Sequence, residues 1–288
     1  MTSAGGAAHY DRVTEVWEKY VMGPELHFGY FESPDDDLAT AASELTTLMA
    51  EESNLQPGLQ VLDVGCGVGT PARRLAAEFG CEVTGISNSR VGVELARARA
   101  DVEGVRFEVT DAMDNGLPDG SFDRVWALES IHVMPDLARV FSECARVLRP
   151  GGRIALCDIV TFGTADPYAA HLRQYREAGH SDEVCRRMYD ATNELQRRAF
   201  GTGGAAPLAA YETQLASAGF TDVQANDLSE PTRPTIERWC KNAHDHAEAI
   251  TEAVGAAYLH DFFYACKQMS SGWGFSIGYV VMTAVKPL

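Results

Sequence analysis

The chain has few basic side chains. Its 288 residues include 24 lysines and arginines against 41 aspartates and glutamates, which gives a formal net charge of −17. A polyanion such as nucleic acid would be repelled by that field, and the sequence contains no basic tract that would offset it. We therefore expect no nucleic-acid partner.

Long hydrophobic runs are also missing. No apolar stretch reaches the roughly 18 residues of a membrane span, although 45% of the residues are hydrophobic, which is ordinary for a globular core. The first six residues, MTSAGG, have no basic region followed by an apolar stretch, so we expect no signal peptide. No membrane partner is predicted.

Closely spaced cysteine pairs are absent. The seven cysteines are odd in number and widely spaced, without a Cys-x-x-Cys motif, which favours reduced thiols and a cytoplasmic location over a zinc site. His244 and His246 lie two residues apart in a predicted helix, where their rings point in different directions. We therefore predict no metal.

The two commonest phosphate-binding motifs are missing from the glycine-rich stretch at 61–69, VLDVGCGVG. It has no Gly-Lys-Ser/Thr, and its third glycine comes one residue too early for Gly-x-Gly-x-x-Gly. What is present is a short apolar strand, a glycine turn and a helix that opens near Pro71. Gly65 and Gly67 let the backbone approach a ligand, and the helix start offers free N–H groups. The stretch predicts a nucleotide-type ligand site.

Strands and helices alternate around this stretch. The apolar segments at 61–64, 81–87, 105–109, 122–128 and 153–160 are separated by helical patterns, which predicts a parallel, buried sheet with right-handed crossovers. Two later strands, 221–228 and 275–285, would close the sheet as an antiparallel hairpin. The predicted fold class is α/β, with a seven-stranded, mostly parallel sheet whose last strand is antiparallel, plus N-terminal helices and an inserted helical cap.

The alternation suggests four segments. Residues 1–55 form an N-terminal helical lid, 56–163 the ligand-binding α/β core, 164–207 a helical cap insertion, and 208–288 the C-terminal part of the core with a helical insertion. The aromatic residues of 235–270 could cover a partner surface, but we favour packing within the core. The oligomeric state stays open, with a dimer as one option.

Several segments match one family in order and spacing. They are LHFGYF at 26–31, VLDVGCGVGT at 61–70, VTGISNS at 83–89, DAM at 111–113, SFDRVWALESIHVMPD at 121–136 and RVLRPGG at 146–152, with Asp158 near the tip of the fifth strand. The chain resembles the class I S-adenosylmethionine (SAM)-dependent methyltransferases, which have a Rossmann-like fold. It is particularly similar to the small-molecule enzymes of bacterial natural-product pathways, such as the rebeccamycin sugar O-methyltransferase. Tocopherol and sterol methyltransferases and cyclopropane-fatty-acid synthases are more distant relatives.

The resemblance implies SAM as the cofactor and assigns residues to it. Asp63 would accept a hydrogen bond from the ammonium group, and the backbone at Gly65 and Gly67 would pack against the methionine part. Many relatives hold the ribose with an acidic residue at the end of the second strand. This chain has Ser87 and Asn88 there, and neutral groups make weaker contacts than charged ones.

Further cofactor contacts follow from the same resemblance. Asp111 and Ala112 would face the adenine, with Asp111 accepting from its amino group. Leu128 would line the methionine and sulfonium side. His27 and Tyr30 match the N-terminal segment that contacts the cofactor in the family.

Three residues near the strand tips are candidate catalytic groups. His132 is the candidate general base for O-methylation, and Asp158 could orient its imidazole or bind the acceptor hydroxyl. The related sugar methyltransferase has a second histidine where this chain has Val133. Glu129 lies in the position where a glutamate of the cyclopropane synthases helps to hold bicarbonate.

Two alternatives to O-methylation remain. One is C-methylation of a prenyl or alkene acceptor through a carbocation. The other is a cyclisation by a methyltransferase fold that keeps SAM as a structural group. The segments outside the sheet contain many aromatic residues and few basic ones, so we expect a bulky, largely apolar small-molecule acceptor with a few hydroxyls.

Overall fold

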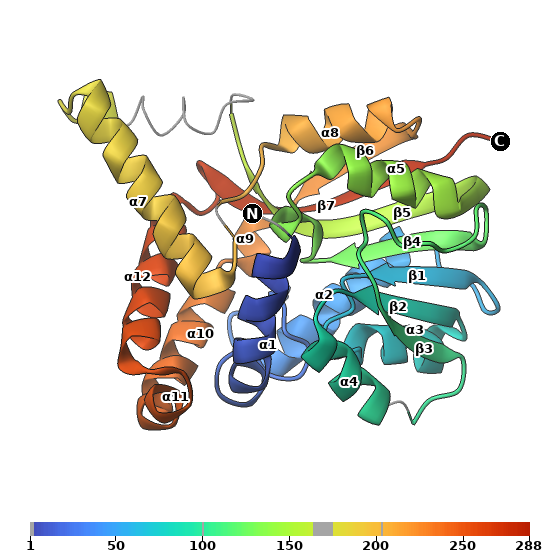
Figure 1. Cartoon of the computed structure of the whole chain (residues 1–288), viewed down its shortest axis with the longest axis horizontal. Coiled ribbons are helices and arrows are strands. Elements are labelled where there is room, and N and C mark those ends of the chain that lie inside the picture. The colour runs from blue at the N-terminus through green and yellow to red at the C-terminus, as the bar shows by residue number, and fades with distance from the viewer. Residues whose placement is uncertain (1–2, 100, 164–174, 203) are drawn as a thin grey trace.

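The fold is organised around one twisted sheet (Figure 1). The computed structural model describes residues 3–99, 101–163, 175–202 and 204–288. The seven strands in this part of the chain run in the order β3-β2-β1-β4-β5-β7-β6. They are β1 (Gln60–Val64), β2 (Glu82–Ser87), β3 (Val105–Val109), β4 (Phe122–Leu128), β5 (Leu148–Thr161), β6 (Thr221–Asp227) and β7 (Ile277–Val285).

The strand directions agree with the predicted topology. The pairs formed by β1, β2, β3, β4 and β5 are parallel, and β7 is antiparallel to both β5 and β6. The predicted Rossmann-like sheet with a reversed last strand is therefore confirmed.

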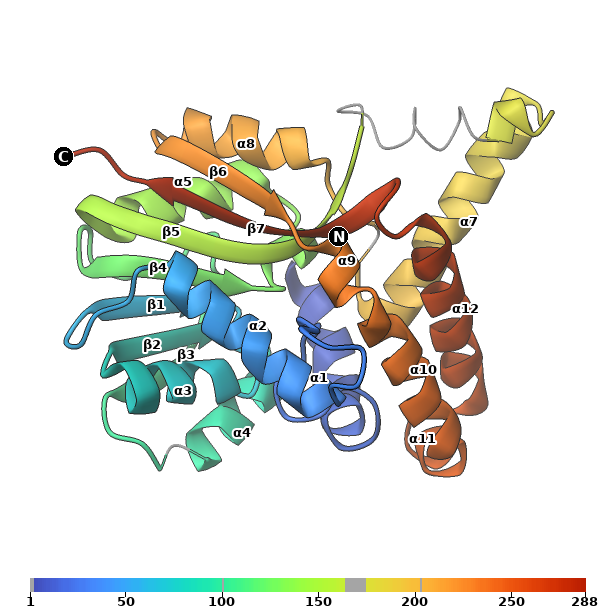
Figure 2. The same cartoon turned by 180° about the vertical axis from the view of Figure 1, so that it is seen from behind.

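Helices cover both faces of the sheet. In the described ranges they are α1 (Ser3–Tyr20), α2 (Leu38–Glu52), α3 (Thr70–Phe79), α4 (Arg90–Ala98), α5 (Leu137–Val147), α7 (Asp182–Phe200), α8 (Leu208–Ser217), α9 (Ser229–Thr232), α10 (Pro234–Asp245), α11 (Ala247–Val254) and α12 (Ala256–Gly272), with a 3₁₀ turn η1 (Ile131–Val133). Because side chains alternate along a strand, Val61 packs with α2 and α3 on one face, whereas Leu62 packs with α5 and α8 on the other. Figure 2 shows α2 and α3 on their face of the sheet.

Several helices begin at residues whose side chains cap them. Asp37 accepts a hydrogen bond from Thr40 N at the start of α2, Ser89 from Gly92 N at α4, and Asp136 from Arg139 N at α5. A side-chain oxygen at this position satisfies one of the N–H groups that the first turn leaves free.

A second group of helices stands beside the strand ends. α7, α10, α11 and α12 lie together at one side of the sheet, and α1 crosses between them and the carboxyl ends of the strands (Figure 1). Trp239, Tyr258 and Phe262 are buried there, so these aromatics of 235–270 pack within the core, whereas Tyr264 is 51% exposed. In the described ranges, no helix is both long and apolar enough to cross a membrane.

The largest differences from the sequence prediction are at the starts of three segments. The apolar spacing of Val13, Val16 and Trp17 predicts a first helix from Tyr10, but α1 begins at Ser3, because the alanines before Tyr10 are strong helix formers. β5 begins at Leu148 rather than at Arg153, since a proline such as Pro150 ends a helix but fits extended chain. In the cap predicted at 164–207, the helix α7 begins at Asp182. Residues 164–174 of this cap lie outside the described part of the chain.

Candidate active site

Two cavities open at the carboxyl ends of the strands. The smaller has a volume of about 160 Å³ and the larger about 840 Å³. Tyr10, Trp17, Leu26 and Glu129 line both, so the cavities meet between α1 and the tip of β4. Ligands of open α/β sheets bind at this edge, beyond the strand ends.

Asp63 lies at the tip of β1 and lines the smaller cavity. Its residue surface is 3% exposed, and its Oδ2 has no hydrogen-bond partner. Burial raises the pKa of Asp63 to about 7. A buried carboxyl oxygen without a partner is costly, so this position suits a cationic, hydrogen-bonding group of a ligand.

The glycine turn after β1 has left-handed backbone at each glycine. Gly65 has φ +83°, and an added Cβ would come 2.2 Å from Ser130 Cβ. Gly69 has φ +75°, and its Cβ would come 2.4 Å from the ring of Phe107. At Gly67, with φ +53°, a Cβ would meet nothing within 4 Å. Gly67 therefore borders open space, whereas Gly65 and Gly69 are required by close packing of the loop itself.

The loop after β2 is held by α1. Ser87 and Asn88 line the smaller cavity, and the next residue, Ser89, donates through Oγ to Asp11 Oδ1 at 2.6 Å. Asp11 Oδ1 also accepts from Val91 N at 3.2 Å. Sequence reasoning missed Asp11, because its partners lie about 80 positions away and no motif marks it.

The other residues assigned to the cofactor divide into two groups. Asp111, Ala112, Leu128 and His27 line the smaller cavity. Tyr30 does not line either cavity and instead packs against the core. Its assignment remains a prediction without geometric support.

His27 belongs to a buried polar network that the sequence did not reveal. Its Nε2 lies 3.2 Å from Glu25 Oε2, and Thr46 Oγ1 donates to the same oxygen at 3.2 Å. Arg74 of α3 lies 3.6 Å from Glu25 Oε1. Burial alone would lower the pKa of His27, but the hydrogen bond and charge of Glu25 leave that pKa raised.

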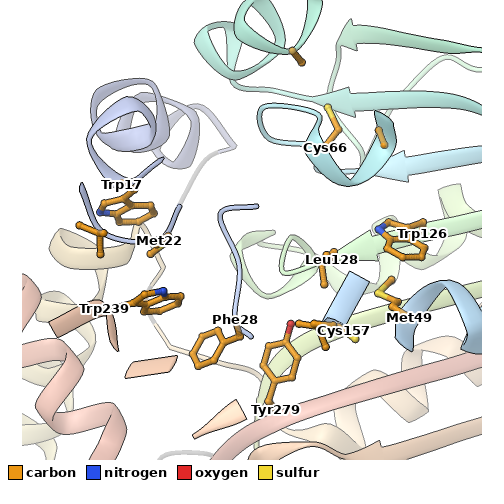
Figure 3. Close-up of a cluster of buried hydrophobic side chains, with 14 of the residues drawn as sticks. Trp17, Met22, Phe28, Met49, Cys66, Trp126, Leu128, Cys157, Trp239 and Tyr279 are labelled. Carbon is orange, nitrogen blue, oxygen red and sulfur yellow. The ribbon is translucent and has the colours of Figure 1, made fainter. Parts of the chain in front are cut away.

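Aromatic rings form one wall of the larger cavity. The Phe28 ring lies 4.6 Å from Trp239 and 5.2 Å from Tyr279, between centroids, and Figure 3 shows it between these two side chains. Trp17 and Met22 lie on the side of α1 (Figure 3). Ring packing of this kind gives a rigid apolar surface.

Neutral polar groups line another side of the larger cavity. They come from one face of α7 and from α12, and they are Tyr189, Thr192, Asn193, Gln196, Gln268 and Ser271. None of the described residues that line either cavity is a lysine or an arginine. The cavity also has Glu129 and Glu177 in its lining, so it disfavours an anionic ligand, while the hydroxyl and amide groups can hydrogen-bond to oxygen atoms of a ligand.

Glu129 lies at the junction of the two cavities. Its backbone has φ +52°, and its Oε1 accepts hydrogen bonds from Phe28 N at 2.6 Å and from Tyr279 Oη at 2.7 Å. Burial raises the pKa of Glu129, although these bonds and nearby histidines oppose the shift. The carboxyl group thereby joins the N-terminal segment to β4 and β7.

His132 and Asp158 are brought together as predicted from their places at neighbouring strand ends. His132 Nδ1 contacts Asp158 Oδ1, and His132 N donates to Asp158 Oδ2 at 2.8 Å. Asp158 is fully buried, whereas His132 lines the larger cavity. Burial would lower the pKa of His132, but the charge and hydrogen bond of Asp158 outweigh it, so the pKa is raised.

The arrangement offers an oriented imidazole at the wall of the larger cavity. Nδ1 of His132 contacts Asp158, and Nε2 forms no hydrogen bond or ion pair within the described residues. Such a nitrogen can take a proton from a bound hydroxyl. Among the described residues, no group of three or more His, Cys, Asp or Glu could hold a metal ion.

Comparison with known proteins identifies the family of this chain. The model of the methyltransferase domain family matches residues 62–156. The chain is 35% identical over 287 residues to the 27-O-demethylrifamycin SV methyltransferase of Amycolatopsis mediterranei, covering 98% of this chain and 96% of that protein. It is 34% identical to methyltransferase GfsG of Streptomyces halstedii, covering 97% and 93%.

A solved structure agrees over the whole fold. The crystal structure of the cyclase SpnF is similar with a TM-score of 0.81 at 30% identity, covering 100% of this chain and 98% of that one. Identity at this level across nearly the full chain, together with the strand order and the cavity at the glycine turn, confirms the predicted family and its cofactor. The chain belongs to the class I SAM-dependent methyltransferases.

Proposed function

We propose that this enzyme transfers the methyl group of SAM to a hydroxyl of a bulky, largely apolar natural product, with His132 as the general base. One observation carries the proposal. His132, oriented by Asp158, lines the larger cavity three residues after Glu129, which lines both cavities. A hydroxyl bound in the larger cavity can therefore lie near both the base and the cofactor.

The smaller cavity is proposed to hold SAM. Asp63 Oδ2, which has no partner, would accept from the ammonium group. Ser87 and Asn88 would contact the ribose, and Asp111 and Ala112 the adenine. Bound SAM supplies an electrophilic methyl group on a cationic sulfur, and Gly65, Gly67, Leu128 and His27 complete the assigned contacts.

His132 would remove the proton of the acceptor hydroxyl as its oxygen attacks the methyl group in line. A positioned base of this kind contributes about 10²- to 10⁴-fold to the rate, and alignment contributes further. Glu129 would act through its hydrogen bonds to Phe28 and Tyr279, which hold the wall between methyl donor and acceptor.

The acceptor would occupy the larger cavity. Its volume of about 840 Å³, its aromatic wall and its neutral polar side support a large, uncharged, oxygenated molecule. One relative at 35% identity is named as the methyltransferase of 27-O-demethylrifamycin SV.

The segment assignments remain part of the proposal. Within the lid proposed at 1–55, α1 lies across the cavities, whereas α2 packs against the sheet. The core (56–163) would hold SAM, and the cap (164–207) with the helical insertion of 208–288 would surround the acceptor. We further propose a cytoplasmic location, with C-methylation of a prenyl or alkene acceptor as an alternative to O-methylation.

Cyclisation without methyl transfer is the second candidate, because SpnF, named as a cyclase, is 30% identical over the whole chain. The contact between His132 and Asp158, which orients a base at the cavity wall, favours transfer. The test is incubation with methyl-labelled SAM and hydroxylated macrocycles, beginning with 27-O-demethylrifamycin SV. We expect label in a new O-methyl group. A cyclised product without label, formed at the normal rate, would overturn the proposal.

A further inference from the structure

Tyr211 reaches the catalytic pair from the opposite face of the sheet. It lies in α8, on the face covered by α5 and α8, and it is fully buried. Its ring contacts Phe141 at 6.0 Å between centroids, and its hydroxyl donates to Asp158 Oδ2 at 3.0 Å. Tyr211 lines neither cavity, so it cannot touch a ligand there.

The side chains around Tyr211 are apolar, so its hydroxyl needs a hydrogen-bond partner. The residues that pack with it form an apolar cluster, in which a phenylalanine ring would fill nearly the same space. A tyrosine hydroxyl is tolerated in such a cluster only with a hydrogen-bond partner. The described structure gives it one, Asp158.

Four hydrogen-bond donors surround the Asp158 carboxylate. Oδ1 accepts from His132 Nδ1 and from Ile159 N, the latter at 3.2 Å. Oδ2 accepts from His132 N at 2.8 Å and from Tyr211 Oη at 3.0 Å. Among these donors, only Tyr211 comes from an element far along the chain, and only its group can be removed without altering the backbone or the base itself.

We propose that Tyr211 is a positioning residue for His132. Its hydroxyl fixes the rotation of the Asp158 carboxylate and takes up part of its negative charge, so that His132 keeps its proton on Nδ1 and presents Nε2 to the acceptor cavity. The inference rests on the proposed function of His132 as the base.

Removal of the hydroxyl has a definite direction. In a buried site, a carboxylate that loses one neutral donor interacts more strongly with its remaining cationic partner. The imidazolium form of His132 is then stabilised, its pKa rises, and less free base is present at neutral pH.

The other titratable groups that face this pair stay in place when the hydroxyl is removed. They are Glu129 at the tip of β4, Cys157 on β5, Tyr10 on α1 and Tyr279 on β7. The last three each interact electrostatically with the carboxyl groups of Glu129 and Asp158. A shift in Tyr211→Phe therefore reports the lost hydrogen bond.

The test is the titration of His132 in Tyr211→Phe. The full chain with S-adenosylhomocysteine is labelled with ¹⁵N-histidine, and the His132 signal is assigned by its absence from His132→Gln. We expect the titration to move to higher pH. With an active acceptor, kcat at pH 7 should fall roughly three- to tenfold, the effect of one hydrogen bond, and recover at higher pH with little change in KM.

Tyr258→Phe is the matched control. It removes another buried tyrosine hydroxyl, which accepts from Trp17 Nε1 at 2.7 Å and donates to Ala199 O at 3.0 Å; these are its hydrogen bonds within the described residues, and Asp158 is not among the partners. We expect it to lower thermal stability without moving the His132 titration. Tyr211→Phe with an unchanged His132 titration would mean a purely structural role and would overturn the inference.

A second replacement guards against a folding defect. Site-specific replacement of Tyr211 by 3-fluorotyrosine keeps the ring and the hydroxyl but makes the hydroxyl a stronger donor, so the titration should move to lower pH. A shift in the other direction, or none, contradicts the inference. These titrations need no turnover, so they stand apart from His132→Ala, whose retained activity would instead refute the proposed base.

Discussion

The smaller cavity, proposed to hold the cofactor, and the larger cavity, proposed to hold the acceptor, are built in different ways; they are called the cofactor cavity and the acceptor cavity below. Apart from α1 and the segment at 25–27, the residues that line the smaller cavity lie between Asp63 and Pro135, at consecutive strand ends. The larger cavity draws most of its lining from residues after Ile159, including α7, α10, α12 and the segment before β7.

This difference decides how each cavity should respond to change. Parallel strands hold their ends in register through hydrogen bonds across the whole sheet, so the cofactor cavity is preformed. The acceptor cavity depends on helices that contact one another only through side chains. Substitutions at strand ends should therefore alter cofactor affinity or chemistry sharply, whereas those in the helical wall should alter acceptor KM mildly.

The largest effect is expected where the two cavities meet. His132→Ala should lower kcat by about 10²- to 10⁴-fold, because the acceptor hydroxyl loses its base, while S-adenosylhomocysteine affinity by calorimetry stays unchanged. In the wild type, kcat should fall as the pH drops through the raised pKa of His132, since protonation removes the base. His244→Ala, an exposed histidine on α10, serves as control. Near-normal turnover in His132→Ala would refute the base.

The next effect tests the preformed cofactor cavity. Asp63→Asn should weaken SAM binding by about 10- to 100-fold, the value of a hydrogen bond to a charged group. The unliganded Asp63 has a pKa of about 7, and an ammonium ligand favours its ionised form. Affinity should therefore rise with pH up to about 7 and then level off, with protons released on binding below that pH.

Calorimetry in buffers of different ionisation enthalpy measures both quantities. The asparagine variant should lose the pH dependence and the proton release. Asp123→Asn is the matched control, since Asp123 lies at the other end of the sheet and accepts from Gln60 N. The same pH dependence in Asp63→Asn and in the wild type would rule out this role.

A smaller effect is expected where α1 is tied to the cofactor loop. Asp11→Asn weakens the hydrogen bonds to Ser89 and Val91, so S-adenosylhomocysteine affinity should fall roughly three- to tenfold, with faster hydrogen exchange in α1. Glu18→Gln is the control on the same helix, because it breaks the ion pair with Arg99 without touching the loop. Equal losses of affinity in both variants would contradict a specific role for Asp11.

The smallest effect is expected in the helical wall. Phe275 lines the larger cavity and is 90% exposed, so its removal should cost little stability. Phe275→Ala should raise acceptor KM about two- to fivefold through lost apolar contact and leave cofactor affinity unchanged. Tyr264→Ala, an exposed aromatic outside both cavities, should change neither value. A large loss of SAM binding in Phe275→Ala would break the separation between the cavities.

Much of the cofactor half could be predicted because its signals are local. The glycine turn, the residues after each strand and the order of the strands are contiguous in sequence, and a parallel sheet brings consecutive strand ends together. The pair formed by His132 and Asp158 follows from the same rule, since β4 and β5 are neighbours.

The rest depended on contacts between distant elements. Asp11, Glu25 and Tyr211 carry no motif, and each acquires its role only from a partner that the fold brings close. The structure also adds a second reason for glycine at position 65. The sequence indicated the approach of a ligand, and the structure shows that a side chain here would collide with Ser130.

The sequence by itself determined the fold class, the family and the edge of the sheet where we propose that SAM binds, because strand alternation and the turn after β1 are properties of short segments. Only the tertiary structure decided which groups are left without partners, as at Asp63, and which are tied together across the sheet, as at Asp158. Burial and hydrogen bonding depend on what lies opposite a side chain, and that neighbour is set by packing over the whole chain.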